Sequence, residues 1–205
     1  MLIQSTSDVS LDSLRRHAAH LPADWHAEVD DAQMFFKAMD VPSWVSVVAE
    51  APWWAQFLAA SASVYVSSII AEAGKDTWKN RGKIAAAVRH APSAISTFAH
   101  FLLSAREAGG SRTFVTLGIP FPDEHNTVHR KLDYSTQDEL EFLIALFVHH
   151  LPALEELWKR EGLLENRPVG GMTLQFGNDC SLLVAWMDRK SLSTCERVLP
   201  FGQDL

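Results

Sequence analysis

Apolar side chains recur at helical spacing through the first half of the chain and at every second position through much of the second half. A period of 3.6 residues is typical of a helix with one buried face, whereas alternation is typical of a strand. Proline and glycine residues divide the first half into separate helical stripes. The pattern predicts helices over residues 11–21, 29–39, 52–73 and 76–89, and a fifth that has Ser93 as its N-cap and ends at Gly109 and Gly110.

Alternation begins after Gly109 and Gly110 and predicts five strands, with one helix between the second and the third. Thr136 and Glu139 have the spacing of a capping box and mark the start of that helix. Pro152 lies inside its apolar stripe, so we expect a kink or a break there. The stretch SLLVAWM is apolar on both faces, which is typical of a central strand covered on both sides.

We therefore predict an α+β protein, in which a helical N-terminal half packs on a small, mostly antiparallel sheet of order β-β-α-β-β-β. Residues 1–110 form the helical region and residues 111–205 the α+β region. Because no linker-like composition separates the two regions, we expect one compact unit. A chain of 205 residues buries about 70% of the surface that it exposes when extended, so it builds a core without crosslinks.

The composition excludes several classes of protein. With 47% apolar and 21% charged residues, the chain is neither disordered nor fibrous. Its two cysteines form neither a disulfide framework nor a four-cysteine zinc site. A hairpin turning at Arg189 and Lys190 would place Cys195 opposite Val184, about four rungs from Cys180, so we predict two free thiols.

Charge is distributed unevenly along the chain. The net charge is −7, with −5 in residues 1–50, +3 in residues 51–110 and −5 in residues 111–205. Acidic ends repel a phosphate backbone, so we expect no nucleic-acid partner. The first ten residues lack the basic and apolar regions of a secretory signal, and we expect a cytoplasmic location.

Residues 51–71 contain no charged side chain. An uncharged stretch of this length is long enough to form a helix that spans a bilayer. Aromatic and basic residues flank this stretch, as membrane anchors do: Trp53, Trp54, Trp78, Lys75, Lys79, Arg81 and Lys83. One hypothesis therefore has helix 52–73 inserting into or docking on a membrane, with the basic segment 75–89 at the lipid surface. The alternative is a buried helix, because its few strong membrane formers contribute only about −2 to −4 kcal/mol to insertion.

Two groups of side chains are candidates for chemistry. His17, His20 and His26 are candidate metal ligands, and the first two share a helix face, but the spacing lacks a third fixed ligand. Candidate catalytic residues are gathered where polar groups converge near the mouth of a predicted strand: Asp123, Glu124, His125 and His129. His125 and His129 are about 13 Å apart on an extended chain, which is too far for a shared metal. We therefore expect no bound metal. We also expect no cofactor, since the sequence lacks a phosphate-binding glycine loop. It lacks the nucleophile elbow of a serine hydrolase as well.

Three functional hypotheses follow. The first is a non-catalytic, soluble interaction protein, such as a regulator, an adaptor or an immunity-type inhibitor, that presents an acidic surface to a protein partner. The second is the membrane-associated effector described above. The third is an enzyme whose site is assembled from residues far apart in the sequence.

Overall fold

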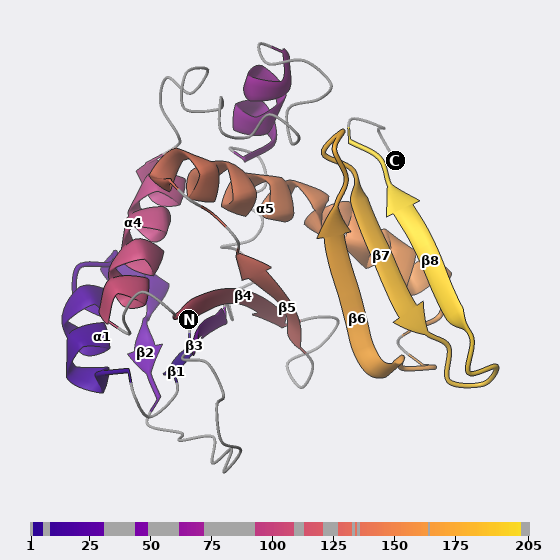
Figure 1. Cartoon of the computed structure of the whole chain (residues 1–205), viewed down its shortest axis with the longest axis horizontal. Coiled ribbons are helices and arrows are strands. Elements are labelled where there is room, and N and C mark those ends of the chain that lie inside the picture. Colours follow the sequence, from indigo (N-terminus) through magenta and orange to yellow (C-terminus); the bar gives the residue numbers. More distant parts are fainter. Residues whose placement is uncertain are drawn as a thin grey trace.

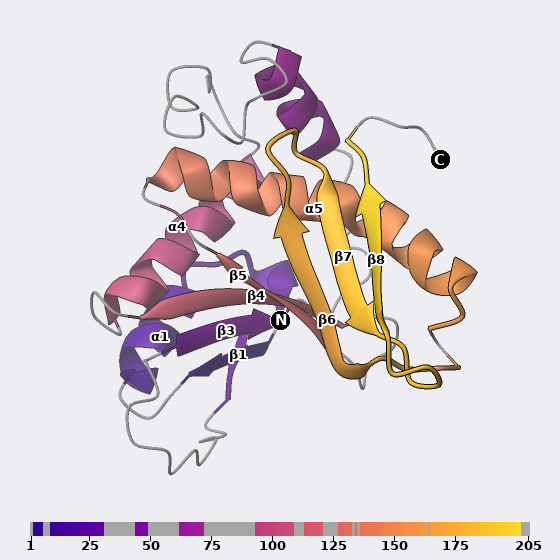
Figure 2. The same ribbon diagram turned by 45° about the vertical axis from the view of Figure 1, so that its right-hand side comes forward.

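The computed structural model describes residues 2–5, 9–30, 44–48, 62–71, 93–108, 113–120, 127–132, 134, 136–163 and 165–201. These residues form helices and two β-sheets, so the protein belongs to the α+β class (Figure 1). The long helix α5 passes over one sheet and behind the other (Figures 1 and 2).

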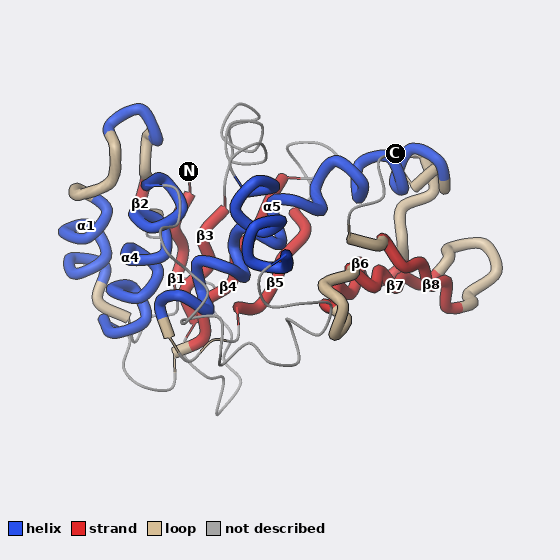
Figure 3. The backbone as a smooth tube through the Cα atoms, turned by 90° about the horizontal axis from the view of Figure 1, so that it is seen from above, coloured by secondary structure: helices blue, strands red, loops and turns tan. Residues whose placement is uncertain are grey.

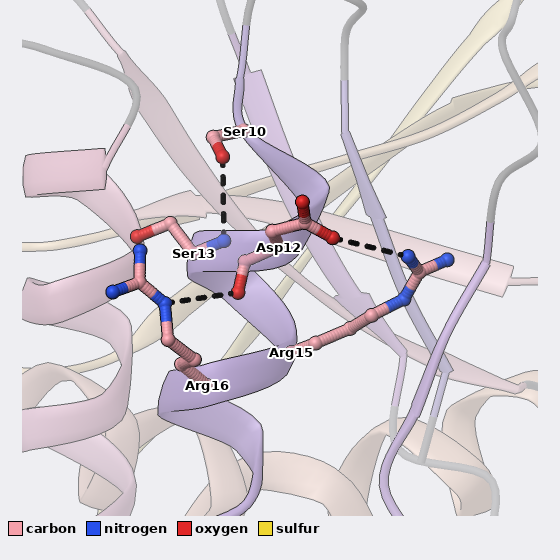
Figure 4. Close-up of polar contacts among 5 residues, drawn as sticks. All are labelled: Ser10, Asp12, Ser13, Arg15 and Arg16. Carbon is pink, nitrogen blue, oxygen red and sulfur yellow. Dashed lines mark hydrogen bonds and ion pairs between the residues drawn. The ribbon is translucent and has the colours of Figure 1, made fainter.

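Helix α1, Leu11–Ala18, forms where the first stripe predicts it. Its N-cap is Ser10, whose hydroxyl oxygen accepts a hydrogen bond of 3.3 Å from the backbone N–H of Ser13 (Figure 4). Asp12 in the first turn forms an ion pair of 3.5 Å with Arg15 one turn later. Leu14 is fully buried on the opposite side, so the helix is fixed by its cap and by one apolar face.

A five-stranded sheet combines strands from both halves of the chain. Its order is β2-β1-β3-β4-β5, and the pairs β1–β2 and β3–β4 are parallel while the other two are antiparallel. Its strands are β1 (Leu2–Ser5), β2 (Glu28–Val29), β3 (Trp44–Val48), β4 (Phe114–Pro120) and β5 (Thr127–Leu132).

The strands β1, β2 and β3 are a departure from the expected all-helical first half. Val29, expected to begin a helix, lies in β2 and pairs with Ile3. These three strands are two to five residues long, so too few positions alternate for a period of two to be recognised. Asp30 is not helical either, and its backbone N–H bonds to the carbonyl oxygen of Ile3 at 2.9 Å. Residues 31–39 of the helix predicted over 29–39 lie outside the described residues, and so does the whole of the helix predicted over 76–89.

Two further helices form as predicted. Helix α4 spans Ser93–Ala108 and helix α5 spans Gln137–Arg160. The hydroxyl of Thr136 accepts a hydrogen bond of 3.2 Å from the backbone N–H of Glu139, which confirms the N-cap. Pro152 does not break α5, which continues for eight residues beyond it to Arg160. Tertiary packing offsets the backbone hydrogen bond that a proline cannot donate inside a helix.

Helix α5 joins the two sheets into one core. Its 24 residues extend over about 36 Å at helical rise. Residues 139–148 are buried on every side, because this part of α5 lies against α4, above the first sheet and below helix 62–71 (Figure 1). The second part buries Leu154, Leu157 and Trp158 where α5 passes behind the second sheet (Figure 2).

The second sheet is antiparallel throughout, with the order β6-β7-β8. Its strands are β6 (Val169–Phe176), β7 (Leu182–Met187) and β8 (Thr194–Leu199). Central strand β7 buries Leu182, Val184 and Trp186 on its inner face. Its outer face is only half-buried at Leu183 and Ala185, so the expected cover on both sides is wrong for the described part of the structure.

The β7–β8 hairpin turns one residue later than predicted. Trp186 pairs with Cys195, whereas the predicted turn placed Val184 there. The carboxylate of Asp188 sets this longer turn by accepting hydrogen bonds from the backbone N–H groups of Lys190 and Ser191, at 3.1 and 2.7 Å. Both cysteines are free thiols, as predicted.

Only residues 62–71 of the uncharged span belong to the described part of the chain, where they form a helix above α5 (Figure 1). Tyr65, Val66 and Ile69 are buried on one face, while Val64 on the other face is 73% exposed. The hydroxyl of Ser63 lies 2.9 Å from Nδ1 of His149 on α5. Within the described ranges, no helix has the length and apolar character needed to cross a membrane.

Candidate functional site

A cavity of about 410 Å³ lies among α1, α4 and the start of α5. Its volume is within the range of small-molecule sites, which begins at about 300 Å³. Polar side chains predominate in its lining, which consists of His17, His20, Leu21, Ser96, Thr97, His100, Phe101, Ser104 and Gln137. Helices α1 and α4 pack side by side at the end of the molecule that is farthest from the second sheet (Figures 1 and 3).

Helix α4 supplies the largest share of the lining. Ser96, His100 and Ser104 stand four residues apart, so they lie along one face of the helix. Phe101 is 3% exposed and closes the floor of the cavity. The polar stripe faces the cavity because Ile95, Phe98 and Leu102 occupy the buried side of α4.

The end of helix α1 supplies two histidines. His17 lies in the last turn of α1, and His20 follows three residues later, where its backbone N–H bonds to the carbonyl oxygen of His17 at 3.1 Å. The last turn also contains Arg15 and Arg16, which extend to different sides of the helix (Figure 4). The C-terminal end of a helix has a partial negative charge, which stabilises these basic side chains.

The first turn of helix α5 closes the cavity with Gln137. The side-chain amide of Gln137 donates a hydrogen bond of 2.9 Å to the buried carboxylate of Glu141. Glu141 also acts on Tyr65, whose pKa is raised, first by burial and then by the charges of Glu141 and Asp138. Asp138, Glu139 and Glu141, the acidic residues at the start of α5, are not among the residues that line the cavity.

Two of the three predicted metal ligands reach this cavity, and the third does not. His17 and His20 line it, whereas His26 is exposed and caps the short 3-10 helix Ala23–Trp25 with a positive φ of 44°. The third imidazole comes from His100 instead. No group of three or more histidine, cysteine, aspartate or glutamate residues in the described part of the chain is arranged to hold a metal ion.

Sequence reasoning missed the contribution of α4. The repeat of Ser96, His100 and Ser104 at intervals of four is visible in the sequence and marks a polar face opposite the apolar stripe. That spacing predicts a polar face on the helix, but it does not identify the element that packs beside this face. Helix α4 packs against α1, and the lining residues of the two helices are more than 70 positions apart in the chain.

The structure does not bring the other candidate residues into this site. His129 belongs to β5, where its backbone is paired with Gly118. The remaining candidates lie outside the described residues: Asp123, Glu124, His125, Trp53, Trp54, Trp78, Lys75, Lys79, Arg81 and Lys83.

A second polar cluster lies at the middle of α5. His149 and His150 contact each other with ring centroids 5.2 Å apart, and the ring of Phe201 lies 4.5 Å from that of His149. Burial lowers the pKa of both imidazoles, that of His150 to about 4. Both rings are therefore neutral at physiological pH and act as hydrogen-bonding groups between packed elements.

Comparisons with protein-family models, with curated proteins and with solved structures find no significant match to this chain.

Proposed function

We propose that this chain is a non-catalytic interaction protein of the cytoplasm, which binds a protein partner through the outer face of the β6-β7-β8 sheet. One observation carries the proposal. Of the five large hydrophobic residues that are exposed in the described part of the chain, four belong to this sheet and its hairpin: Val169, Met187, Leu192 and Val198.

These side chains are placed to form one surface. Val169 and Met187 are cross-strand partners and therefore point to the same face. Val198 is the cross-strand partner of Leu183. Leu183 alternates along β7 with the buried residues, so both side chains belong to the outer face of the sheet. Exposed apolar side chains that gather on one face are typical of an interaction surface.

The net charge of −7 supports a partner with basic character. Opposite charges steer the encounter of two proteins and raise the association rate, while the apolar contact holds the complex. Glu196, exposed between Thr194 and Val198, places one negative charge on the outer face itself. The binding rate is therefore expected to fall as ionic strength rises.

The experiment is affinity purification of the tagged chain, followed by identification of any protein recovered in stoichiometric amount. The double variant Met187→Glu with Val198→Glu places charges in the apolar surface and is expected to lose that protein, because a buried unpaired charge costs several kcal/mol, of the order of 3–5.

The matched control is Val64→Glu, which introduces the same charge at an exposed valine on helix 62–71, above α5 rather than on the sheet. This control is expected to retain the partner. Recovery of no stoichiometric partner, or loss of the partner with Val64→Glu but not with the double variant, would contradict the proposal.

A further inference from the structure

We propose that the cavity among α1, α4 and α5 binds a small organic anion, a carboxylate or a phosphate monoester attached to an apolar body. This site lies at the opposite end of the molecule from the β6-β7-β8 sheet (Figure 3). The proposal does not depend on the protein partner proposed above.

The first argument is the chemistry of the lining. Three imidazoles, three hydroxyl groups and one amide surround the cavity, and none of the lining residues is aspartate, glutamate, lysine or arginine. A cationic ligand would find no carboxylate among these lining residues to compensate its charge. An anion would instead accept hydrogen bonds from imidazole N–H and hydroxyl groups, and charge-assisted hydrogen bonds are the stronger kind.

The second argument is that the donors are available. The described residues form no hydrogen bond or ion pair with the side chains of His17, His20 or His100. His20 and His100 are also exposed, so their ring nitrogens are free to meet a ligand at the rim. By contrast, Gln137 is already oriented by its hydrogen bond to Glu141, and so it contributes a fixed wall.

The third argument concerns the shape and polarity of the interior. Leu21 and Phe101 are 9% and 3% exposed and form the apolar floor beneath the polar rim. A small inorganic ion would leave this floor uncovered, whereas a ligand with an apolar body would bury it. The floor therefore favours an organic anion over free phosphate or sulfate.

The fourth argument is the local electrostatic field. Helix α1 contains two arginines and one aspartate, and this surplus of positive charge offsets the partial negative charge of its C-terminal end, next to His17. Arg15 and Arg16 are exposed and do not line the cavity, so their charges attract an anion at this edge only weakly, through solvent. Helix α1 therefore adds a weak long-range attraction for an anion to a chain that is acidic overall.

The test is a titration of the full chain, with binding followed by calorimetry and by the imidazole resonances in NMR spectra. Benzoate and phenyl phosphate are the two anionic probes, and benzyl alcohol is the uncharged probe with the same ring. We expect at least one of the two anions to shift three of the nine histidine signals, and benzyl alcohol to shift none. A response to only one of the anions identifies which anionic group the site accepts.

Variants locate the binding. His100→Ala keeps a good helix former in α4 and is expected to weaken anion binding about tenfold or more, because one charge-assisted hydrogen bond is lost. Ser104→Ala is a second, milder variant on the same face, with an expected loss of about fivefold. The control His26→Asn removes an imidazole outside the cavity and suits the left-handed backbone there, so binding should be unchanged.

Three results would overturn the proposal. The first is that neither anion shifts a histidine signal. The second is that benzyl alcohol binds as well as the anions. The third is that His26→Asn weakens binding as much as His100→Ala does, with both variants giving the unfolding curve of the parent chain.

Discussion

His150 of α5 and the backbone of Cys180 are joined by a buried hydrogen bond, in which the ring Nε2 donates to the carbonyl oxygen of Cys180 at 2.8 Å. A carbonyl oxygen only accepts, so Nε2 carries the proton of the neutral ring. Burial is the largest cause of the lowered pKa of His150, which is about 4. This bond attaches the turn just before β7 to the middle of α5, and by itself it raises the pKa, because a charged ring would also donate it; burial outweighs that effect and keeps the imidazole neutral.

The stability of the protein is expected to fall as the pH drops from 6.5, the ordinary pKa of the ring, to about 4, its value in the folded state. Between these two values the unfolded chain binds the proton and the folded chain does not, so acid favours unfolding. The loss is about 3 kcal/mol for His150 when integrated over this window. The lowered pKa of His149 acts in the same direction. Urea unfolding at a series of pH values measures the effect.

The variant His150→Gln separates this contribution from that of the carboxylates, which also titrate in acid. It is expected to be less stable than the parent chain at neutral pH, because the hydrogen bond to Cys180 is weakened or lost. Its stability should decline less steeply over the same pH window. Equal slopes for the two proteins would show that His150 does not titrate as described.

Ser63→Ala is expected to destabilise the protein by about 1 kcal/mol, the usual net value of a hydrogen bond between neutral side chains. The hydroxyl of Ser63 and Nδ1 of His149 are 2.9 Å apart, and this bond joins helix 62–71 to α5. The control is Ser67→Ala one turn later, where the serine is exposed and the change should be within about 0.5 kcal/mol. Thermal unfolding of both variants measures the difference, and equal stability of the two would contradict the contact.

The two thiols are expected to differ in reactivity. Cys180 is 1% exposed and is held at the start of β7, whereas Cys195 is partly exposed on β8. A thiol reagent reaches only an accessible sulfur, so it should modify one cysteine quickly in the native protein and both after denaturation. Mass spectrometry of the labelled peptides identifies the site, and faster labelling of Cys180 than of Cys195 would be the opposite of the expected order.

Leu192→Gly is expected to leave the protein as stable as the parent or to stabilise it by up to about 1 kcal/mol. Leu192 is 68% exposed at the tip of the β7–β8 hairpin and has a positive φ of 53°, which L-residues other than glycine adopt at a cost. Chemical denaturation measures the change.

The control Leu192→Ala shortens the same side chain and keeps the unfavourable backbone, so it should not stabilise the protein. If the proposed interaction surface is correct, both variants weaken partner binding and only the glycine variant gains stability. Stabilisation by alanine to the same extent would show that the side chain, rather than the backbone, is the source of the cost.

The second half of the fold was the more predictable part of this chain. Helix α5 was recognisable because an apolar stripe from Leu140 to Trp158 follows the capping-box spacing of Thr136 and Glu139. The β7–β8 hairpin was recognisable too, but its register was not, since the choice of turn depends on how the Asp188 carboxylate bonds to the next residues. Local pattern thus gave the elements, and side-chain geometry set their alignment.

The strands of the first half and the cavity depend on contacts between distant residues. Val45 pairs with Val115, 70 positions away, and a local sequence pattern cannot predict a pairing over that separation. The cavity depends in the same way on the packing of α1 against α4. His17 and His20 could be singled out because they are three apart on one helix, whereas His100 becomes part of the group only when the fold is complete.

The parallel pairing of β3 with β4 has a consequence for how the chain is made. On the ribosome, Trp44–Val48 emerges long before its neighbour Phe114–Pro120, and until then one side of β3 has unpaired backbone groups. An open strand of this kind is prone to pair with another nascent chain, so synthesis passes through an aggregation-sensitive interval. That interval closes only when β4 is free of the exit tunnel, after translation has passed well beyond Pro120.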